Sequence, residues 1–156
     1  MAIIAYTDGS SLGNPGPGGY GIILLDTVRE VKKEISAGFR ITTNNRMELL
    51  AVIVALENLK QPNTEITIYT DSKYVSDSVE KKWVFGWEKK GFKGKKNPDL
   101  WKNFLIQYRK HQVKFQWIKG HAGNVWNERA DELAVAAANG KNLLADVNFE
   151  ENRDIG

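Results

Sequence analysis

The first forty residues alternate between β-branched, apolar stretches and turn-forming segments. Residues 2–7, 20–25 and 31–39 are rich in residue types that favour strands. Residues 9–19 hold five of the chain's 14 glycines and two of its four prolines, which predicts a tight loop after the first strand. A short polar turn near residues 26–29 separates the second strand from the third. Because short connections join antiparallel neighbours, this region is predicted to be a three-stranded meander.

A helical repeat dominates the middle of the chain and returns near its end. Apolar residues three and four positions apart predict a long helix that ends before Pro62, namely Leu49, Val52, Ile53, Leu56 and Leu59. An alanine-rich helix is predicted over residues 128–139, with Asn127 as its N-cap and Gly140 closing it. Between these helices the pattern predicts strands at 66–70 and 113–118, helices at 73–82 and 99–110, and an irregular basic segment at 86–98.

The predicted order of elements is therefore β-β-β-α-β-α-α-β-α. Strands that are separated by helices tend to pair in parallel, whereas the first three strands are joined as hairpins. The expected fold class is α/β, with a mixed sheet and helices packed on it. No domain linker or long-period repeat is evident, so residues 1–142 are expected to form one domain. The polar residues 143–156 are expected to form a mobile, disordered C-terminal tail.

Composition narrows the class of protein. The chain has 156 residues, 42% of them hydrophobic and 26% charged, which are ordinary values for one globular domain. The absence of cysteine excludes disulfides, thiolate metal sites and a cysteine nucleophile. The N-terminus does not resemble a secretory signal, and the longest apolar run, residues 49–56, is far shorter than the ~20 residues that span a membrane. We expect a soluble, cytoplasmic protein that does not enter a membrane.

Positive charge is concentrated in one segment. Residues 81–119 carry twelve Lys or Arg residues against two acidic residues, Glu88 and Asp99, which leaves a local net charge of +10. The rest of the chain carries 10 basic and 17 acidic residues, and the whole chain has a net charge of +3. A basic stripe on an otherwise acidic protein favours a polyanionic partner. A solvated, lysine-rich surface explains the charge equally well, so both interpretations stay open.

A short internal repeat singles out two aspartates. The tripeptide Tyr-Thr-Asp occurs at residues 6–8 and again at residues 69–71, and each copy ends a predicted strand before a turn-forming residue. Ligands gather at the carboxyl ends of strands in open α/β sheets. If these two strands are neighbours, Asp8 and Asp71 lie side by side at such an end. Alternatively, each Asp merely starts a turn, which is a common role for a single Asp.

Two further carboxylates lie on apolar helix faces. Glu48 shares its face with Ala, Val and Ala at positions 51, 52 and 55, and Asp131 with the same residue types at positions 134, 135 and 138. A carboxylate in apolar surroundings is unfavourable unless it is paired or binds a cation. Simpler explanations exist for both. Glu48 can complete a capping box with Asn45, and Asp131 can interact with the positive end of its helix.

Four carboxylates in a chain without cysteine point to hard ions that prefer oxygen, Mg²⁺ or Mn²⁺ rather than Zn²⁺. Facing a nucleic acid, such a cluster suits two-metal hydrolysis of a phosphodiester, in which one ion activates water and the other stabilises the leaving oxygen. His121 lies in a loop of small residues at 119–123, where a flexible imidazole can shuttle protons. Loop histidines are more often simply solvated, and His111 has only a surface position to recommend it.

Several motifs carry a resemblance to a known family. They are YTDGS at 6–10, GNPGPGG at 13–19, TTNNRMEL at 42–49, TDS at 70–72, KGHAG at 119–123 and NERAD at 127–131. In this order, across residues 3–138, they resemble type 1 ribonuclease H in its short bacterial form. The resemblance implies a five-stranded mixed sheet, three strands antiparallel and two parallel, flanked by helices. It also implies an endonuclease that hydrolyses the RNA strand of RNA–DNA hybrids and leaves 5′-phosphate and 3′-hydroxyl ends.

The resemblance assigns the reaction to specific side chains. It implies that two Mg²⁺ ions, for which Mn²⁺ can substitute, are held by Asp8, Glu48, Asp71 and Asp131. His121 is implied to serve in proton transfer or product release. The implied partner is the RNA–DNA hybrid, and we expect a monomer without an obligate protein partner.

Other motif residues are implied to bind the substrate. Three short amides are able to read 2′-hydroxyls in a minor groove, the groups that separate RNA from DNA, namely Asn14, Asn44 and Asn45. Thr43 and Asn97 resemble residues that grip a phosphate of the DNA strand. Trp83 and Trp87, four positions apart on one helix face, either line the DNA channel or pack in the core. Five lysines match the family's basic protrusion, a handle for the hybrid: Lys89, Lys90, Lys93, Lys95 and Lys96.

The chain departs from the family pattern at three places. Ile41 stands where relatives often carry Arg, so the phosphate pocket departs from the family pattern. Lys73 stands where some relatives have Gln. The basic protrusion is a few residues shorter than in some relatives. A module that binds hybrids without cutting is an alternative, which loss of a carboxylate would favour, but all four are present. A DNA-cutting nuclease of the same wider fold is another, but such proteins lack Asn14 and the residues at 43–45 beside a lysine protrusion.

Overall fold

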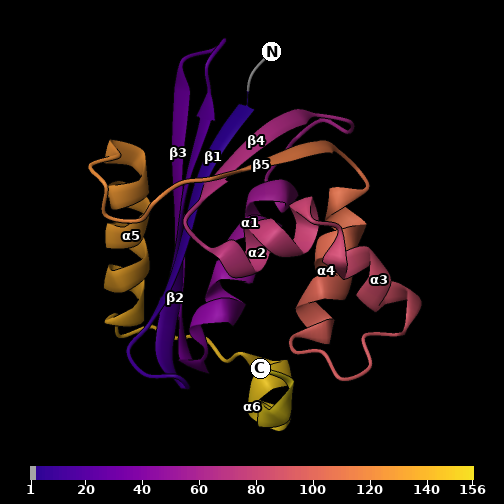
Figure 1. The fold of residues 1–156 in the computed structure, drawn as a ribbon. Helices are drawn as coiled ribbons and strands as arrows, with labels where there is room; N and C mark the ends of the chain where they lie inside the picture. The colour runs from indigo at the N-terminus through magenta and orange to yellow at the C-terminus, as the bar shows by residue number, and fades with distance from the viewer. Residues whose placement is uncertain (1–2) are drawn as a thin grey trace.

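A five-stranded mixed sheet forms the centre of the molecule in the computed structural model, which describes residues 3–156 (Figure 1). The strands lie in the order β3-β2-β1-β4-β5. Their bounds are Ile3–Ser11 for β1, Gly16–Asp26 for β2, Val31–Thr42 for β3, Glu65–Thr70 for β4 and Gln112–Trp117 for β5. β1, β2 and β3 pair antiparallel, whereas β4 pairs in parallel with both β1 and β5. The predicted mixed sheet is confirmed; the predicted start of β1, at Ala2, lies outside the described residues.

Helices cover both faces of the sheet. The helix α5 (Val125–Ala138) packs on β1, β2 and β3, and Figure 1 shows it alone on its side. The opposite face carries α1 (Asn44–Glu57), with α2 (Lys73–Glu80), α3 (Trp83–Lys89) and α4 (Pro98–Tyr108) beyond it (Figure 1). The main apolar core lies on this second side, where α1 packs against β1, β2 and α4. None of the helices in residues 3–156 combines the length and the apolar character that a membrane crossing requires.

The glycine-rich segment at residues 9–19 is mostly strand, which corrects the prediction of a long loop. β1 runs to Ser11 and β2 starts at Gly16, with Leu12 donating its N–H to the carbonyl of Pro17 at 2.7 Å. Glycine is used here because α5 lies very close to the sheet. A Cβ at Gly19 would stand 2.6 Å from the carbonyl oxygen of Ala134, and one at Gly21 would collide with the backbone of Ala130. These glycines therefore serve packing rather than turning.

Both long helices begin earlier than the sequence pattern predicts. The N-cap of α1 is Thr43, whose hydroxyl accepts a hydrogen bond from the N–H of Arg46 at 3.2 Å. The N-cap of α5 is Asn124 rather than Asn127. Glu48 is consequently the fifth residue of α1 and Asp131 the seventh of α5. The capping-box and helix-terminus explanations for these two carboxylates do not hold, because both act only in the first turn.

The C-terminal residues 143–156 are ordered and packed, contrary to the expectation of a disordered tail. They form α6 (Val147–Glu151) and a 3-10 turn (Arg153–Ile155). Leu144 exchanges backbone hydrogen bonds with the end of β3, donating to Gly38 at 2.8 Å and accepting from Arg40 at 2.9 Å. The side chain of Phe149 is 1% exposed. A segment with these contacts belongs to the folded body of the protein.

A buried arginine explains why this segment docks. Arg46 on α1 is 1% exposed, and its guanidinium lies 5.6 Å from the centroid of the Phe149 ring. It donates to Asp146 at 2.7 Å and to Asp99 at 2.8 Å. A buried cation without partners is strongly unfavourable, so Asp146 and Asp99 are both needed to hold Arg46 inside the protein. The sequence pattern missed this because Asp146 lies 100 residues after Arg46.

Phe149→Ala is expected to lower the free energy of unfolding by about 3 kcal/mol, because it empties a site packed on Arg46. Urea denaturation measures this directly. Val147→Ala is the matched control, since Val147 lies in the same helix but is 56% exposed; it should change stability by less than about 0.5 kcal/mol. If both variants are equally mild, the C-terminal segment is not docked in solution.

Candidate active site

The register between β1 and β4 brings two aspartates together. Tyr6 pairs with Tyr69 and Thr7 with Thr70, so the repeated tripeptide lies in register on two parallel neighbours. The two tyrosine rings stack with centroids 4.8 Å apart. β4 ends at Thr70, while β1 continues along β2. Asp8 and Asp71 therefore lie side by side where β4 stops, with Asp71 just past the end of β4 and Asp8 still within β1, which corrects the prediction that Asp8 ends its strand.

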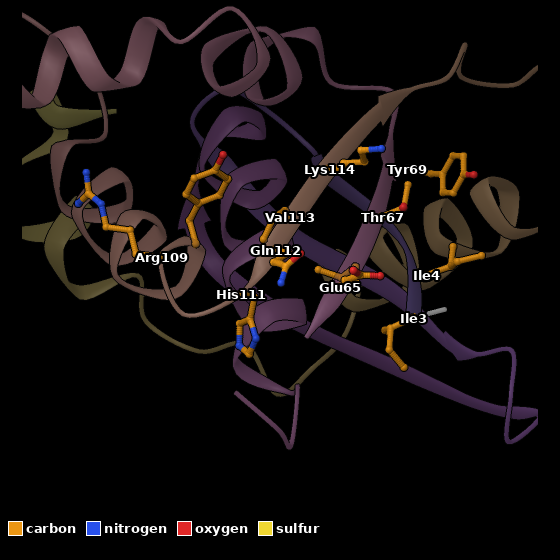
Figure 2. A pocket seen from close by; sticks show the side chains of 12 residues that line it. Ile3, Ile4, Glu65, Thr67, Tyr69, Arg109, His111, Gln112, Val113 and Lys114 are labelled. Carbon is orange, nitrogen blue, oxygen red and sulfur yellow. The ribbon is translucent and has the colours of Figure 1, made fainter. Parts of the chain in front are cut away.

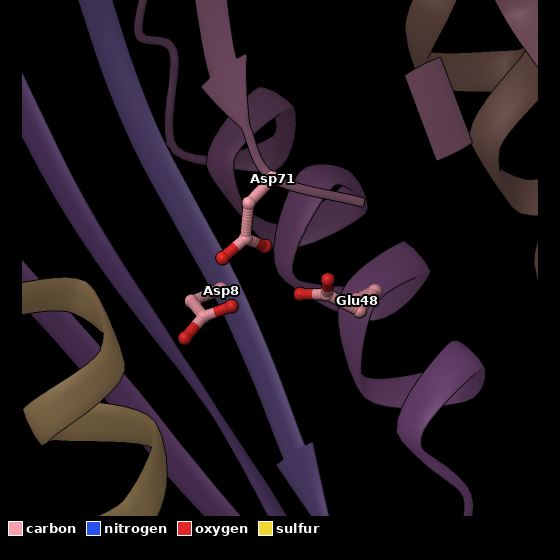
Figure 3. A group of neighbouring side chains, drawn as sticks. All are labelled: Asp8, Glu48 and Asp71. Atoms are coloured by element: carbon pink, nitrogen blue, oxygen red, sulfur yellow. The ribbon is translucent and has the colours of Figure 1, made fainter. Parts of the chain in front are cut away.

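Glu48 joins these two aspartates from α1. One oxygen each of Asp8, Glu48 and Asp71 lies within 4.8 Å of the others, and Figure 3 shows the three carboxylates turned toward one another. Glu48 reaches this position because α1 passes very close to β1. A Cβ at Gly9 would collide with the backbone of Met47 and Glu48. The N–H of Gly9 also donates a hydrogen bond to the Glu48 carboxylate, which fixes its direction.

Asp131 lies beside this trio rather than within it. It is half-buried on α5, and its side chain interacts with that of Asp8 by a hydrogen bond. Among the described residues, the group of carboxylates that lie within reach of one ion has three members, and Asp131 is not one of them. The close packing of α5 on the glycines of β2 sets its distance from Asp8.

Burial and mutual repulsion shift the pKa values of two carboxylates in the cluster. Burial, followed by repulsion from Glu48 and contacts with Asp131 and Asp71, raises the pKa of Asp8 far above its ordinary value. Burial and the charge of Asp71 likewise raise the pKa of Glu48. Buried carboxylates without a countercharge are unfavourable, and hard divalent cations prefer oxygen ligands. The donor set therefore fits a divalent metal ion.

The loop between β5 and α5 closes one side of the cluster. The backbone of Gly120 lies against Asp71, so that a Cβ there would stand 2.6 Å from Oδ2 of Asp71. The next residue, His121, is exposed and has a positive φ of 57°. His121 is thus an exposed residue directly after the glycine that borders Asp71.

The expected amide group lies at the start of α1. The N–H of Asn44 donates to Oδ1 of Asn14 at 3.1 Å, which ties the β1–β2 connection to the helix. Asn14, Asn44 and Asn45 are all exposed. Thr43 is half-buried, and its hydroxyl oxygen serves as the N-cap of α1. Asn14, Asn44 and Asn45 therefore lie close together, and their side chains are accessible to solvent.

Asn97 differs from the expectation of a phosphate contact. It is 1% exposed, and both ends of its amide are engaged. Its Oδ1 accepts from Arg46 at 3.2 Å and its Nδ2 donates to the hydroxyl of Tyr74 at 3.0 Å. Its backbone N–H donates to the carbonyl of Ile155 in the C-terminal turn. In this conformation Asn97 supports the buried network around Arg46 rather than the surface.

The tryptophans and lysines form a separate basic surface. Trp83 is 48% exposed, whereas Trp87 is half-buried and packs edge-on against Trp101 with centroids 5.9 Å apart. Packing in the core therefore accounts in part for the presence of Trp87, but it does not account for Trp83. Both border a hollow of about 290 Å³ that Lys90, Lys93 and Lys95 also line. The five predicted lysines are exposed, at positions 89, 90, 93, 95 and 96.

A larger hollow lies away from the carboxylates. It measures about 740 Å³ and opens near the amino-terminal ends of β4 and β5, as Figure 2 shows with Glu65 and Gln112 on its wall. None of the three clustered carboxylates lines it. His111 at its edge accepts a hydrogen bond from the N–H of Thr64 at 3.2 Å, and burial lowers the pKa of its imidazole. The carboxylate cluster, not the larger hollow, is therefore the candidate for chemistry.

Comparison with known proteins identifies the family. The RNase H family model matches residues 1–139. A Ribonuclease H from Desulforamulus reducens is 53% identical over 150 residues, which cover 93% of this chain and 92% of that protein. The chain belongs to the RNase H family. The Ribonuclease HI of Synechocystis sp. is also similar to this RNase H, at 47% identity over 155 residues that cover 95% of this chain and 94% of that protein.

Solved structures of other RNases H share the fold. LC9-RNase H1, a type 1 RNase H with the type 2 active-site motif, has a TM-score of 0.81 and 34% identity, covering 96% of this chain and 79% of its own. LC11-RNase H1 in complex with an RNA/DNA hybrid has a TM-score of 0.68 and 30% identity, covering 88% and 96%. The family and the fold implied by the motifs are confirmed. RNases H are metal-dependent, which agrees with the acidic cluster.

Sequence reasoning missed Arg46, which holds the start of α1 in this RNase H through Asp99 and Asp146. A signal was present: Arg46 lies inside the TTNNRMEL motif, two residues before Glu48 on a mostly apolar helix. A charged residue in such a position needs a buried partner. Its partners were not identifiable, because nothing in the local pattern links residue 46 to residues 99 and 146.

Asp8→Asn is expected to stabilise the metal-free protein at neutral pH. The folded protein retains a proton on Asp8 that the unfolded chain releases above pH ~4, so this site contributes less stability as pH rises. In EDTA at pH 7, the free energy of unfolding should increase by at least about 1 kcal/mol, with a smaller gain at pH 4. Urea denaturation at both pH values measures this, with the exposed Glu30→Gln as control. Equal gains in stability at both pH values would contradict a repulsion between Asp8 and the neighbouring carboxylates.

Proposed function

We propose that this RNase H is an endonuclease that hydrolyses the RNA strand of RNA–DNA hybrids and leaves 5′-phosphate and 3′-hydroxyl ends. The observation that carries this proposal is the convergence of Asp8, Glu48 and Asp71 at the point where β4 ends beside its parallel neighbour β1. Buried carboxylates of like charge are unfavourable together, and a bound cation would supply the missing countercharge. The relatives named Ribonuclease H and the hybrid complex of LC11-RNase H1 supply the substrate class.

Asp8, Glu48 and Asp71, with Asp131 beside Asp8, are the proposed ligands of two Mg²⁺ ions, and Mn²⁺ is the proposed substitute. Bound ions of this kind would activate water and stabilise the charge that develops on the leaving oxygen. The protein's own contribution is positional. Gly9 directs Glu48, the end of β4 sets Asp71 beside Asp8, and α5 brings Asp131 within hydrogen-bonding distance of Asp8.

His121 is the proposed group for proton transfer or product release. Its exposed imidazole stands on the loop that borders Asp71 through Gly120. An imidazole has two ring nitrogens that can accept or donate a proton, so His121 is able to take a proton or hand one to the leaving oxygen. Because it lies on a loop rather than in a helix or strand, its side chain would be able to move as the product is released.

Strand discrimination is proposed to depend on the exposed amides of Asn14, Asn44 and Asn45. Asparagine both donates and accepts hydrogen bonds, and the 2′-hydroxyl that it would meet is present only on RNA. Thr43, at the start of the same helix, is the proposed contact to a phosphate of the DNA strand. The buried Asn97 is proposed to support this region through Arg46.

The basic surface is the proposed handle for the hybrid. Trp83 and Trp87 border a hollow with exposed lysines around it, which combines flat apolar area with positive charge. The lysines would bind phosphates without regard to sequence. Nothing in this arrangement requires a second chain, so the protein is proposed to act as a monomer.

The proposal is tested with one labelled sequence prepared as RNA–DNA hybrid, RNA duplex and DNA duplex, each with Mg²⁺ and with EDTA. Cleavage should occur only in the RNA strand of the hybrid and only with metal. A protein that binds the hybrid without cutting any form would instead be a binding module. The assembled carboxylates and the ribonuclease relatives do not favour that alternative.

Glu48→Gln is expected to lower kcat by at least about 100-fold, because it removes one charge that holds the ions. Hybrid binding in EDTA should stay within about threefold of the original, since the phosphate and sugar contacts are untouched. Glu57→Gln, at the exposed end of the same helix, is the matched control. If both variants cleave normally, Glu48 is outside the reaction centre.

Replacing the five lysines at 89, 90, 93, 95 and 96 by Ala should weaken hybrid binding and flatten its dependence on salt. The slope of log K against log[salt] should shrink by roughly 0.9 for each lysine that contacts a phosphate. Fluorescence anisotropy at several salt concentrations measures it. The control replaces five other exposed lysines, at 33, 60, 102, 110 and 141. Equal slopes for the two variants would make the basic surface a solvated one.

A further inference from the structure

Trp117 makes an unusual contact with a residue of the carboxylate cluster. It is the last residue of β5, and its indole Nε1 donates a hydrogen bond to the backbone carbonyl of Asp71 at 3.1 Å. The ring is 38% exposed, so burial alone does not explain a tryptophan here. The ammonium of Lys73 lies 4.7 Å from the ring centroid. An exposed indole is thus held between a cation and the backbone of Asp71.

Asp71 is the member of the cluster that most needs such support. Asp8 lies within β1 and Glu48 within α1, whereas Asp71 falls between the end of β4 and the start of α2. The residues around it have local partners. Thr70 accepts at its carbonyl from Ile118 at 2.9 Å and at its hydroxyl from Ser72 at 3.0 Å. The carbonyl of Asp71 itself is met by the indole of Trp117.

The same segment touches Asp71 from a second direction. Trp117 pairs with Thr70 in the β4–β5 register, so its indole reaches one residue beyond the end of the strand. Three residues later, Gly120 lies against the Asp71 carboxylate. Residues 117–120 therefore hold the backbone and the side chain of Asp71 together, and Lys73 restrains the ring from the start of α2.

We propose that Trp117 is a positioning residue that fixes the peptide of Asp71, so that its carboxylate points at Asp8 and Glu48. This inference rests on the proposed function, because it takes Asp71 to be a metal ligand. Trp117 touches neither the ion nor the hybrid in this role. Without the indole N–H, the carbonyl of Asp71 turns to water, and the carboxylate is no longer held in the direction that metal binding requires.

Trp117→Phe tests the proposal, because it removes the N–H donor and keeps a smaller aromatic ring near Lys73. Binding of Mn²⁺ by calorimetry, without any nucleic acid, should weaken about 10-fold. In cleavage assays, the metal concentration for half-maximal rate should rise by a similar factor, while KM for the hybrid stays unchanged and kcat recovers at saturating metal. Trp126→Phe is the control, since Trp126 also lies under a lysine, Lys32 at 5.4 Å.

Three results would overturn the proposal. A raised KM with unchanged Mn²⁺ affinity would make Trp117 a surface that stacks on nucleic acid. An equal fall in melting temperature with and without Mn²⁺, with unchanged affinity, would make it structural only. If the Mn²⁺ affinity, the KM and the melting temperature are all unchanged, Trp117 does not position Asp71. If instead the unaltered protein binds no Mn²⁺, the proposed metal site fails as well, and so the two failures are distinguishable.

Discussion

The parallel pairing of β1 with β4 is the constraint on which the rest of the site depends. Thr7 faces Thr70 in this register, and β4 goes no further. A shift by one residue would turn Asp8 or Asp71 to the other face of the sheet, because side chains alternate along a strand. The stacked rings of Tyr6 and Tyr69 are consistent with the observed register and mark it just before the two aspartates.

Two opposite electrostatic arrangements lie within one turn of α1. Arg46 is buried with two aspartates, so its charge is more than balanced. Glu48, two residues later, is buried beside the carboxylates of Asp8 and Asp71. The first arrangement secures the helix, and the second makes it unfavourable for the site to remain without metal. The unfavourable burial of Glu48 is thus offset two residues earlier in the same turn of the helix, by the ion pairs of Arg46.

Local patterns predicted what depends on neighbouring residues in the chain. The order of the elements along the chain followed from periodicity, and the repeated tripeptide indicated that Asp8 and Asp71 would lie side by side if their strands were neighbours, which they are. Gly19 was wrongly assigned to a loop because the reason for a glycine there is its contact with α5, more than a hundred residues later. The ordered C-terminal segment was missed for the same reason, because Phe149 and Asp146 are held in place by contacts with Arg46, which is distant in the sequence. Asn97 looked like a surface amide until its partners were known.

The link between Arg46 and Asp146 also bears on how the protein is made. During synthesis, α1 leaves the ribosome long before residue 146, so its guanidinium first meets Asp99 alone. Chains grow at about 5–20 residues per second, which leaves several seconds in which the sheet is nearly complete and this helix is half-anchored. The last helix to emerge therefore completes the fold. A nascent chain that stalls before residue 146 would lack one of the two carboxylates that hold Arg46 at the start of α1.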